Sequence, residues 1–175
     1  VFTPSQTDST SLGGRTVLAL HEDDHGSIWI GTFLMGLWRY NQDTGVFRHF
    51  DLGRTYGGQP EADRVNAITQ DEQGRLWVGL QYGLASVDIA TGAVTWHDEL
   101  KAVLDSESRV IDITSVMADT KGRIWCGTDK NGVIIYSPEN GDVRRLEHNP
   151  DREQSLPSPV AYHIAQTSDG KIWIA

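Results

Sequence analysis

The stretch Asp71–Leu80, DEQGRLWVGL, places Trp77 between aliphatic residues and two positions ahead of Gly79. A strand with one face in water would alternate apolar and polar residues, so this continuous apolar run indicates a strand buried on both faces. Related stretches occur as DDHGSIWIGT, DTKGRIWCGT and TSDGKIWIA, which end at Thr32, Thr128 and Ala175. The stretch is therefore one copy of a repeated unit, and the length of that unit decides the fold.

The repeat has a constant period of 48 residues. This period is shared by the central tryptophans, Trp29, Trp77, Trp125 and Trp173, and by the turn glycines, Gly26, Gly74, Gly122 and Gly170. Equal intervals between copies of a rare residue do not arise by chance, and a period of this length is typical of repeat architectures. We expect one partial domain over residues 1–175, with repeat cores at about 17–64, 65–112 and 113–160 and an incomplete last unit at 161–175.

Each unit contains four short segments with the composition of β-strands. In the first unit these segments are TVLAL, IWIGT, GLWRYN and VFRHF, separated by glycine-containing turns. Four antiparallel strands in about 40–50 residues are typical of a propeller blade. The sequence therefore predicts an all-β fold, a β-propeller fragment of about three and a half blades of four-stranded antiparallel sheet. An α-solenoid lacks support because the apolar spacing is not helical, and a β-sandwich would not require a constant period.

Burial between neighbouring blades explains the composition of the tryptophan strand. We interpret each tryptophan as the filler of the wedge between two blades, and a glycine such as Gly31 as a point of close backbone approach. Trp38 and Trp96 lie outside this position, where packing is the simpler interpretation and ligand contact the alternative. Cys126 replaces an aliphatic residue of the other copies and reads as a small buried apolar side chain. The segment Asp98–Asp105 is expected to form one or two helical turns within a loop.

An aspartate stands three residues before the turn glycine in each of three units, as Asp23, Asp71 and Asp119. A calcium loop would need several carboxylates at alternating positions, so a turn stabilised by the carboxylate is the preferred interpretation. The histidines are scattered over the repeat rather than clustered; they are His21, His25, His49, His97, His148 and His163. We accordingly expect no catalytic residue, no metal site and no cofactor.

The charge balance excludes some partners. With 15 basic and 24 acidic residues the net charge is −9, which argues against binding of nucleic acid or of an anionic membrane. The single cysteine rules out an internal disulfide. No apolar run in the sequence is long enough to cross a bilayer, and we expect no membrane contact by this segment.

The motifs D-x-x-G-x-I-W-I-G-T, G-L-W-R-Y-N and T-G-x-F, together with the linker Leu146–Ile164, resemble the two-component regulator propeller repeat. In that family the repeats build the periplasmic sensor region of hybrid histidine kinases. The resemblance implies a non-catalytic, ligand-sensing module, a periplasmic location, and a glycan fragment or another small molecule as ligand. Two positions depart from the family pattern, because Leu80 stands where threonine is expected and Ala85 where a larger residue is expected.

Loops that differ between repeats over a constant scaffold are the candidate recognition surface. One set follows the tryptophan strands, at residues 33–35, 81–82 and 129–131, and the other links the units, at 52–64, 97–109 and 147–159. Loops also diverge when nothing constrains them, and that alternative stays open. Planar donor groups suit polyhydroxyl or carboxylate ligands. The candidate ligand-binding residues, which lie in or beside loops, are Arg15, Arg54, Tyr56, Arg64, Tyr82 and Arg109.

Two other functions are compatible with the fold. A propeller lyase resembling the streptogramin lyases would need a histidine and a metal-binding glutamate near the channel, and this set cannot be placed in the sequence. A pure protein-interaction scaffold would need no small ligand. Because an open arc leaves two apolar blade faces in water, we also expect the chain to self-associate.

Overall fold

The computed structural model describes residues 11–50, 52, 63–104 and 110–175. It contains three four-stranded antiparallel sheets, each with its strands in sequence order, and one two-stranded sheet. Blade 1 comprises β1 (Val17–Glu22), β2 (Ile28–Thr32), β3 (Leu37–Asn41) and β4 (Val46–Phe50). Blade 2 comprises β5 (Val65–Gln70), β6 (Leu76–Leu80), β7 (Gly83–Val87) and β8 (Val94–Trp96). Blade 3 comprises β9 (Ile113–Ala118), β10 (Ile124–Thr128), β11 (Val133–Ser137) and β12 (Asp142–Leu146), and the last sheet pairs β13 (Ile164–Gln166) with β14 (Ile172–Ile174).

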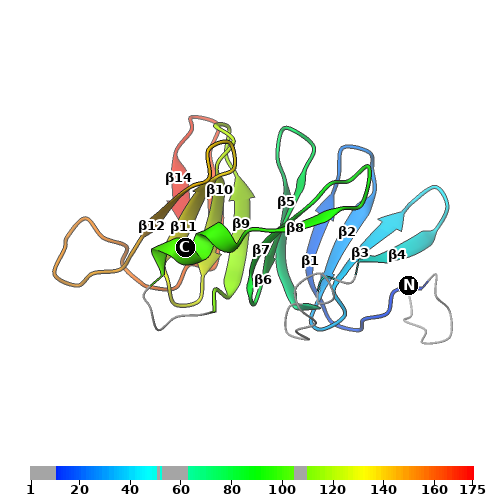
Figure 1. Ribbon diagram of the computed structural model, residues 1–175, viewed down its shortest axis with the longest axis horizontal. Helices are drawn as coiled ribbons and strands as arrows, with labels where there is room; N and C mark the ends of the chain where they lie inside the picture. Colours follow the sequence, from blue (N-terminus) through cyan, green and yellow to red (C-terminus); the bar gives the residue numbers. More distant parts are fainter. Residues whose placement is uncertain (1–10, 51, 53–62, 105–109) are drawn as a thin grey trace.

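The sheets stand side by side in an arc, in the order of the sequence (Figure 1). The first strands of neighbouring blades lie against each other, β1 on β5 and β5 on β9. The predicted fold class is confirmed, since the described part of the chain is all-β, built of four-stranded blades, and does not close into a ring. A short 3-10 helix, η2 (Asp98–Val103), lies where helical turns were expected, and it packs on β7 and β12.

The repeated tryptophans fill the joints between blades, as predicted. Trp29 is fully buried in a cluster that contains Val65 and Val78 of blade 2. Trp77 is likewise fully buried against blade 3, and Trp125 packs against residues that lead into β13. Trp173 occupies the same position in the last sheet, yet 65% of its surface is exposed. Each tryptophan therefore depends on the following blade for its burial.

The glycine two positions after each tryptophan allows the next blade to approach. A Cβ atom on Gly79 would lie 2.6 Å from Cγ2 of Ile113, and one on Gly127 would lie 2.5 Å from the carbonyl oxygen of Ala161. Both contacts are shorter than a side chain tolerates, so only glycine fits without displacing the following strand. The interpretation of this glycine as a point of close approach is therefore correct.

The aspartate before each turn glycine holds its own blade together. Oδ1 of Asp71 accepts hydrogen bonds from the amides of Gln73 and Arg75 at 3.1 and 2.9 Å. Oδ2 accepts the indole N–H of Trp77 at 2.7 Å, and Asp23 and Asp119 bind their own tryptophans at 2.8 Å. The turn interpretation is confirmed, and the same carboxylate also satisfies the buried indole, which the sequence did not reveal. Gly74 completes the turn with a φ of 77°.

The remaining singled-out apolar residues pack as expected. Trp38 is 6% exposed and donates its indole N–H to the carbonyl of Met35 at 2.7 Å, and Trp96 packs on the core between blades 1 and 2. Cys126 is completely buried, and burial raises the pKa of its thiol. In the described residues no helix has the length and apolar character needed to cross a membrane.

Candidate functional site

The antiparallel order of the strands sorts the connections onto two edges of the arc. Within each blade, the hairpin turns between the first and second strands and between the third and fourth strands lie on one edge, the turn face, at the top of Figure 1. The turns between the second and third strands and the linkers between blades lie on the opposite edge, the loop face. The loop face therefore collects the segments that vary most between repeats.

Arg64, Asn66 and Asp112 form the polar centre of the loop face. Arg64 and Asn66 lie at the start of β5, and Asp112 immediately precedes β9 of the next blade. Asn66 donates its amide to Oδ1 of Asp112 at 2.8 Å and to the carbonyl of Ile113 at 2.9 Å. Nη1 of Arg64 lies 3.8 Å from Oδ2 of Asp112. The three side chains thus connect two blades across the inner end of the arc.

Burial makes the Asp112 carboxylate unfavourable where it stands. Its side chain is 17% exposed, and this burial raises its pKa, as does the nearby Asp129, although Arg64 and the amide of Asn66 act in the opposite direction. Asp119 on the turn face behaves differently. Burial alone would raise the pKa of Asp119, but hydrogen bonds from Trp125, Arg123 and Lys121 hold it below its usual range. Asp112 is therefore a charge that its own surroundings do not fully compensate.

Arg64 also reaches the first blade. Its guanidinium carbon lies 5.4 Å from the centre of the Phe33 ring, which is in the range of a cation–π contact. Its Nε is buried and has no hydrogen-bond partner among the described residues. Phe33 is 44% exposed, and its amide is fixed by the carbonyl of Thr16 at 3.1 Å. The guanidinium consequently lies between an aromatic ring and a carboxylate, with donor capacity left over.

Next to Phe33 the loop face has a small apolar hollow. A cavity of about 170 Å³ lies between the turn that contains Leu34 and Met35 and the segment that leads into β1, which contains Arg15. Leu34 and Met35 are about half exposed. The equivalent turns of blades 2 and 3 carry polar residues, so the apolar character belongs to blade 1 alone among the described blades.

The structure places three of the six candidate residues. Arg15 and Arg64 lie near Phe33 on the loop face, Arg15 exposed and Arg64 half-buried, and Tyr82 lies in the β6–β7 turn of the same face. Arg54, Tyr56 and Arg109 lie outside the described residues. The sequence reasoning missed Asn66 and Asp112, because their contact joins residues 46 positions apart. The one available signal was that a charged residue precedes the first strand in blades 2 and 3 where Thr16 stands in blade 1.

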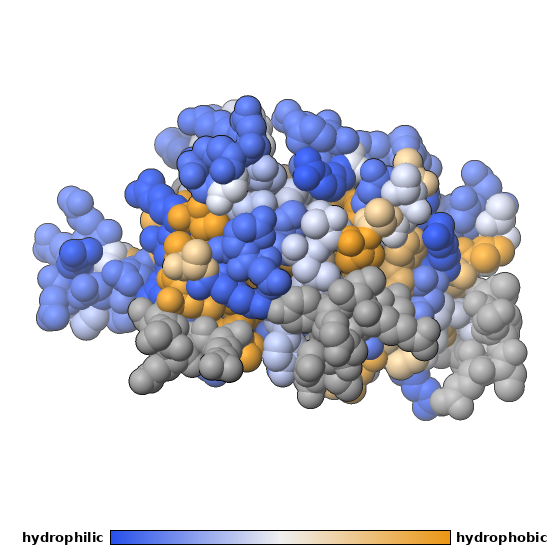
Figure 2. All heavy atoms as spheres, viewed as in Figure 1, coloured by the Kyte–Doolittle hydropathy of each residue, from blue (hydrophilic) through white to orange (hydrophobic). Residues whose placement is uncertain are grey.

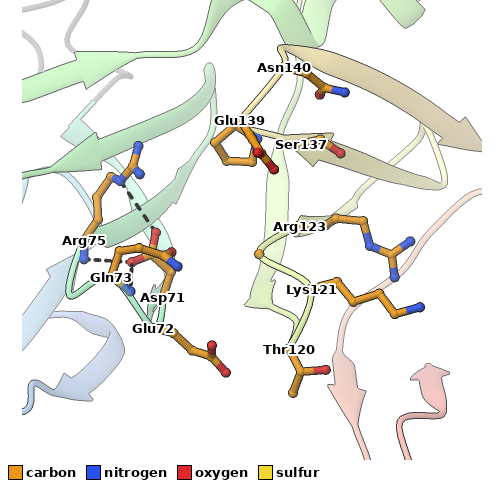
Figure 3. Close-up of a pocket in the computed structure, with 12 residues that line it drawn as sticks. Asp71, Glu72, Gln73, Arg75, Thr120, Lys121, Arg123, Ser137, Glu139 and Asn140 are labelled. Carbon is orange, nitrogen blue, oxygen red and sulfur yellow. Dashed lines mark hydrogen bonds and ion pairs between the residues drawn. The ribbon is translucent and has the colours of Figure 1, made fainter.

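The turn face also has hollows between blades, and the arginines beside its tryptophans lie close to the turn aspartates. A pocket of about 780 Å³ lies between the turns of blades 2 and 3, with Arg75 on one side and Arg123 on the other (Figure 3). Nε of Arg75 lies 3.5 Å from Asp71, and Nη2 of Arg123 lies 2.6 Å from Asp119. Each guanidinium also covers the tryptophan of its own blade. These groups repeat from blade to blade, as structural parts do.

A second hollow of about 1020 Å³ lies beside the first on the turn face, lined by residues of blades 1 and 2 that include Arg39. Arg39 of β3 lies over Trp29 and 3.7 Å from Asp23, and its Nε, like that of Arg64, is buried without a hydrogen-bond partner among the described residues. The edge of the arc that carries the turns is largely hydrophilic in Figure 2. In the described residues no group of three or more metal-binding side chains is assembled on either face.

Comparison with known proteins identifies the repeat. A family model described as the two component regulator propeller matches residues 11–33 and 59–82, which include the tryptophan strands of blades 1 and 2. These two stretches are similar to the two component regulator propeller repeat. No relative was found among curated proteins.

Several solved structures are similar to this repeat array. One is the extracellular domain of a protein described as a one component system of B. thetaiotaomicron, with a TM-score of 0.79 and 22% identity over 98% of this chain and 22% of that chain. Another is the extracellular domain of a hybrid two component system of the same organism, with a TM-score of 0.53, 19% identity, and coverage of 99% of this chain and 27% of that chain. Virginiamycin B lyase from Staphylococcus aureus has a TM-score of 0.69 and 14% identity, over 91% of this chain and 48% of the lyase. The chain thus spans about a fifth to a half of these proteins, and the likeness concerns the fold.

Proposed function

We propose that this chain is the ligand-recognition part of an extracytoplasmic, periplasmic sensor that belongs to a two-component signalling receptor. The repeats are of the two component regulator type, and two similar structures are extracellular domains of proteins described as one component and hybrid two component systems. In this proposal the propeller binds and does not catalyse, and a histidine kinase elsewhere in the receptor carries the signal onward.

One observation carries the proposal: the loop face holds a partly buried charge that its own blades do not compensate. Asp112 keeps a carboxylate where burial raises its pKa, and Arg64 keeps a buried donor without a partner. Charged groups kept at some cost in stability are typical of recognition sites. The turn aspartates show a different arrangement, since Asp23, Asp71 and Asp119 each accept an indole N–H and lie within 4 Å of an arginine.

The groups on the loop face fit a small polar ligand. The Arg64 guanidinium and the Asn66 amide can donate hydrogen bonds, the Asp112 carboxylate can accept them, and the Phe33 ring offers a flat apolar surface. Hydroxyl and carboxylate groups on a compact ligand meet these requirements, which includes the glycan fragments that the repeat resemblance implies.

A binding screen tests the proposal. The chain is to be screened by thermal shift and calorimetry against neutral oligosaccharides, uronic acids, small carboxylates and divalent metal salts. We expect a hydroxylated or carboxylated compound to raise the melting temperature, because a ligand that binds only the folded state stabilises it. Arg64→Ala should weaken that compound at least about tenfold, which corresponds to roughly 1.4 kcal/mol.

Lys121→Ala is the matched control, because Lys121 is an exposed cation on the turn face. This variant should bind as the parent does. An equal loss of affinity in Arg64→Ala and Lys121→Ala would contradict the placement of the site on the loop face. Stabilisation by magnesium alone would favour the lyase function, and binding of a protein partner without any small-molecule effect would favour an interaction scaffold.

A further inference from the structure

The joint between blades 2 and 3 contains a buried polar network. His97 follows β8 and is 9% exposed, with its ring 4.8 Å from Trp77 and 5.2 Å from Tyr136 of blade 3. Nε2 of His97 lies 2.9 Å from the hydroxyl of Ser86, and Nδ1 lies 3.7 Å from Oε1 of Glu99 in η2. Tyr136 donates its hydroxyl to the same Glu99 oxygen at 3.0 Å. The network therefore crosses from β7 through the helix to β11 of the next blade.

The same positions in the other blades are filled differently. In blade 1 the third strand begins at Leu37, which pairs with Phe50 of the fourth strand. In blade 3 the third strand begins at Val133, which pairs with Leu146. In blade 2 the residue at the position of Phe50 and Leu146 is His97, whose amide binds the carbonyl of Leu84 at 2.9 Å. The residue paired with the joint tryptophan is Arg39 in blade 1, Ile135 in blade 3 and Ser86 in blade 2. Blade 3 thus has apolar residues at both positions, whereas blade 2 has a histidine and a serine there.

The network includes a serine, a histidine and a glutamate, but the structure does not present the serine as a nucleophile. Ser86 is 5% exposed and lies in an interior strand, paired with Trp77 on one side and Thr95 on the other. The separation between His97 and Glu99 also exceeds a hydrogen bond. The geometry therefore supports a role in the joint itself.

A proton on His97 would be unfavourable in this position. Burial lowers the pKa of His97, and the positive charge of Arg75, which immediately precedes β6, acts in the same direction, while Glu99 opposes them. The other polar groups that face the ring are the hydroxyls of Ser86 and Tyr136, and burial together with Glu99 raises the pKa of Tyr136 to about 12. The tyrosine hydroxyl thus stays protonated and offers no negative charge to a histidine cation.

We propose that the joint between blades 2 and 3 is an acid-sensitive hinge of the arc, in which protonation of His97 loosens the packing of η2 and blade 3 on blade 2. The joint between blades 1 and 2, which has Phe50 on Trp29 at 5.1 Å, carries no such group at this position and stays closed over the same pH range. The hinge would open and close the arc in response to the acidity of its surroundings.

The sign of the effect follows from the direction of the shift. The unfolded chain binds a proton near the ordinary histidine pKa of 6.5, whereas the folded chain binds it at a lower pH. The histidine contribution to stability is therefore complete above pH 6.5 and is lost as the pH falls towards the folded pKa. One proton of this kind changes the folding equilibrium constant by at most about tenfold per pH unit.

His97→Phe tests the hinge with the residue that blade 1 uses at the same position. Urea unfolding of the chain is to be measured from pH 7.5 to pH 5 for the parent, for His97→Phe, and for His25→Phe, which alters an exposed histidine on the turn face. We expect the folding equilibrium constant of the parent to fall several-fold more over this range than that of His97→Phe. His25→Phe should follow the parent. The same pH dependence of the folding equilibrium constant in the parent and in His97→Phe would overturn the proposal.

Two measurements on the parent chain need no variant. The His97 ring is to be titrated by NMR, and it should titrate below pH 6.5; a value at or above 6.5 would overturn the proposal. Hydrogen exchange at pH 5.5 and 7.5, corrected for the intrinsic exchange rates, should show added exchange at acid pH in η2 and β9. An equal increase of exchange in β4 and β5, which flank the joint between blades 1 and 2, would contradict a hinge confined to the joint between blades 2 and 3.

Discussion

At the scale of single residues, one carboxylate performs two tasks in each blade. Asp71 closes the turn between the first two strands through backbone amides and also accepts the indole N–H of Trp77. The tryptophan is thereby fixed in the orientation that the next blade packs against. Three blades repeat this arrangement with nearly the same indole distances, 2.7 to 2.8 Å. The aspartate and tryptophan of the repeat are therefore one structural unit.

Replacement of Asp71 by alanine should destabilise the chain strongly. The buried indole N–H of Trp77 and two turn amides would lose their acceptor, and unsatisfied buried donors of this kind cost about 3 kcal/mol in total. Asp43→Ala, in the exposed turn of blade 1, is the control and should leave the urea midpoint unchanged. Equal stability of Asp71→Ala and the parent would show that the carboxylate does not hold the tryptophan.

Replacement of Asp112 by asparagine should raise the stability of the chain at pH 7, whereas replacement of Asp71 by alanine lowers it. Burial raises the pKa of Asp112 above its usual value of 3.8. The Asp112 carboxyl therefore has no effect on stability below pH 3.8, and it lowers stability as the pH rises from 3.8 through the folded pKa. We expect Asp112→Asn to be more stable than the parent at pH 7, with the difference vanishing near pH 3.5. Asp119→Asn is the counterpart, because its lowered pKa stabilises the fold at pH 7, and urea unfolding should show a loss there. A loss of stability in Asp112→Asn at pH 7 would contradict the description of the loop face.

At the scale of strands and turns, the short turn between β6 and β7 explains why Leu80 stands where threonine was expected. In blades 1 and 3 the threonine that ends the second strand bridges the following turn, as when Thr128 donates its hydroxyl to the carbonyl of Gly132 at 2.8 Å. Blade 2 has Leu80 here, and its turn is shorter, since Leu80 pairs directly with Gly83. In this shorter turn no threonine is needed to bind a carbonyl across the loop, and leucine stands in its place.

This shorter turn also shifts the residues that follow it. A strict period of 48 would place His97 at the position of His49, whereas the structure places it at the position of Phe50. Strands, joints and turns could thus be predicted from the repeated tryptophans and glycines, because local patterns encode them. The polar contacts of His97 and Asn66 could not, because they depend on the register between strands and on contacts between blades.

The close approach between blades makes a further prediction. Gly127→Ala should destabilise the chain by about 1–3 kcal/mol, because its Cβ would meet the carbonyl oxygen of Ala161, which is backbone and cannot rotate away. Chemical denaturation measures the loss, and exchange of the β13 amides should rise at the same time. Unchanged stability would mean that the joint between blade 3 and the last sheet is looser than described.

At the scale of the whole molecule, the arc has one apolar face at each end. Leu20 of β1 is 66% exposed although Ile164, its counterpart in the last sheet, is 3% exposed, and Trp173 is exposed although its three counterparts are buried. Both ends therefore lack, within the described residues, the neighbour that every internal blade has. The joints between internal blades show what such a neighbour would bury.

We expect the isolated chain to self-associate through these ends. Light scattering coupled to size exclusion should give a mass above 19.4 kDa that rises with concentration. Trp173→Glu should lower the association, while Trp96→Phe, which alters an internal tryptophan, should not. A parent chain that stays monomeric at high concentration would show that the two ends are covered by other means.

The central claim is that the two edges of the arc have different tasks, recognition on the loop face and cohesion on the turn face. Hydrogen exchange with and without the compound found in the binding screen tests it most directly. We predict added protection at residues 14–16, 33–36, 63–66 and 110–114, and none at 23–27, 71–75 and 119–123. Protection confined to the second set would contradict the claim.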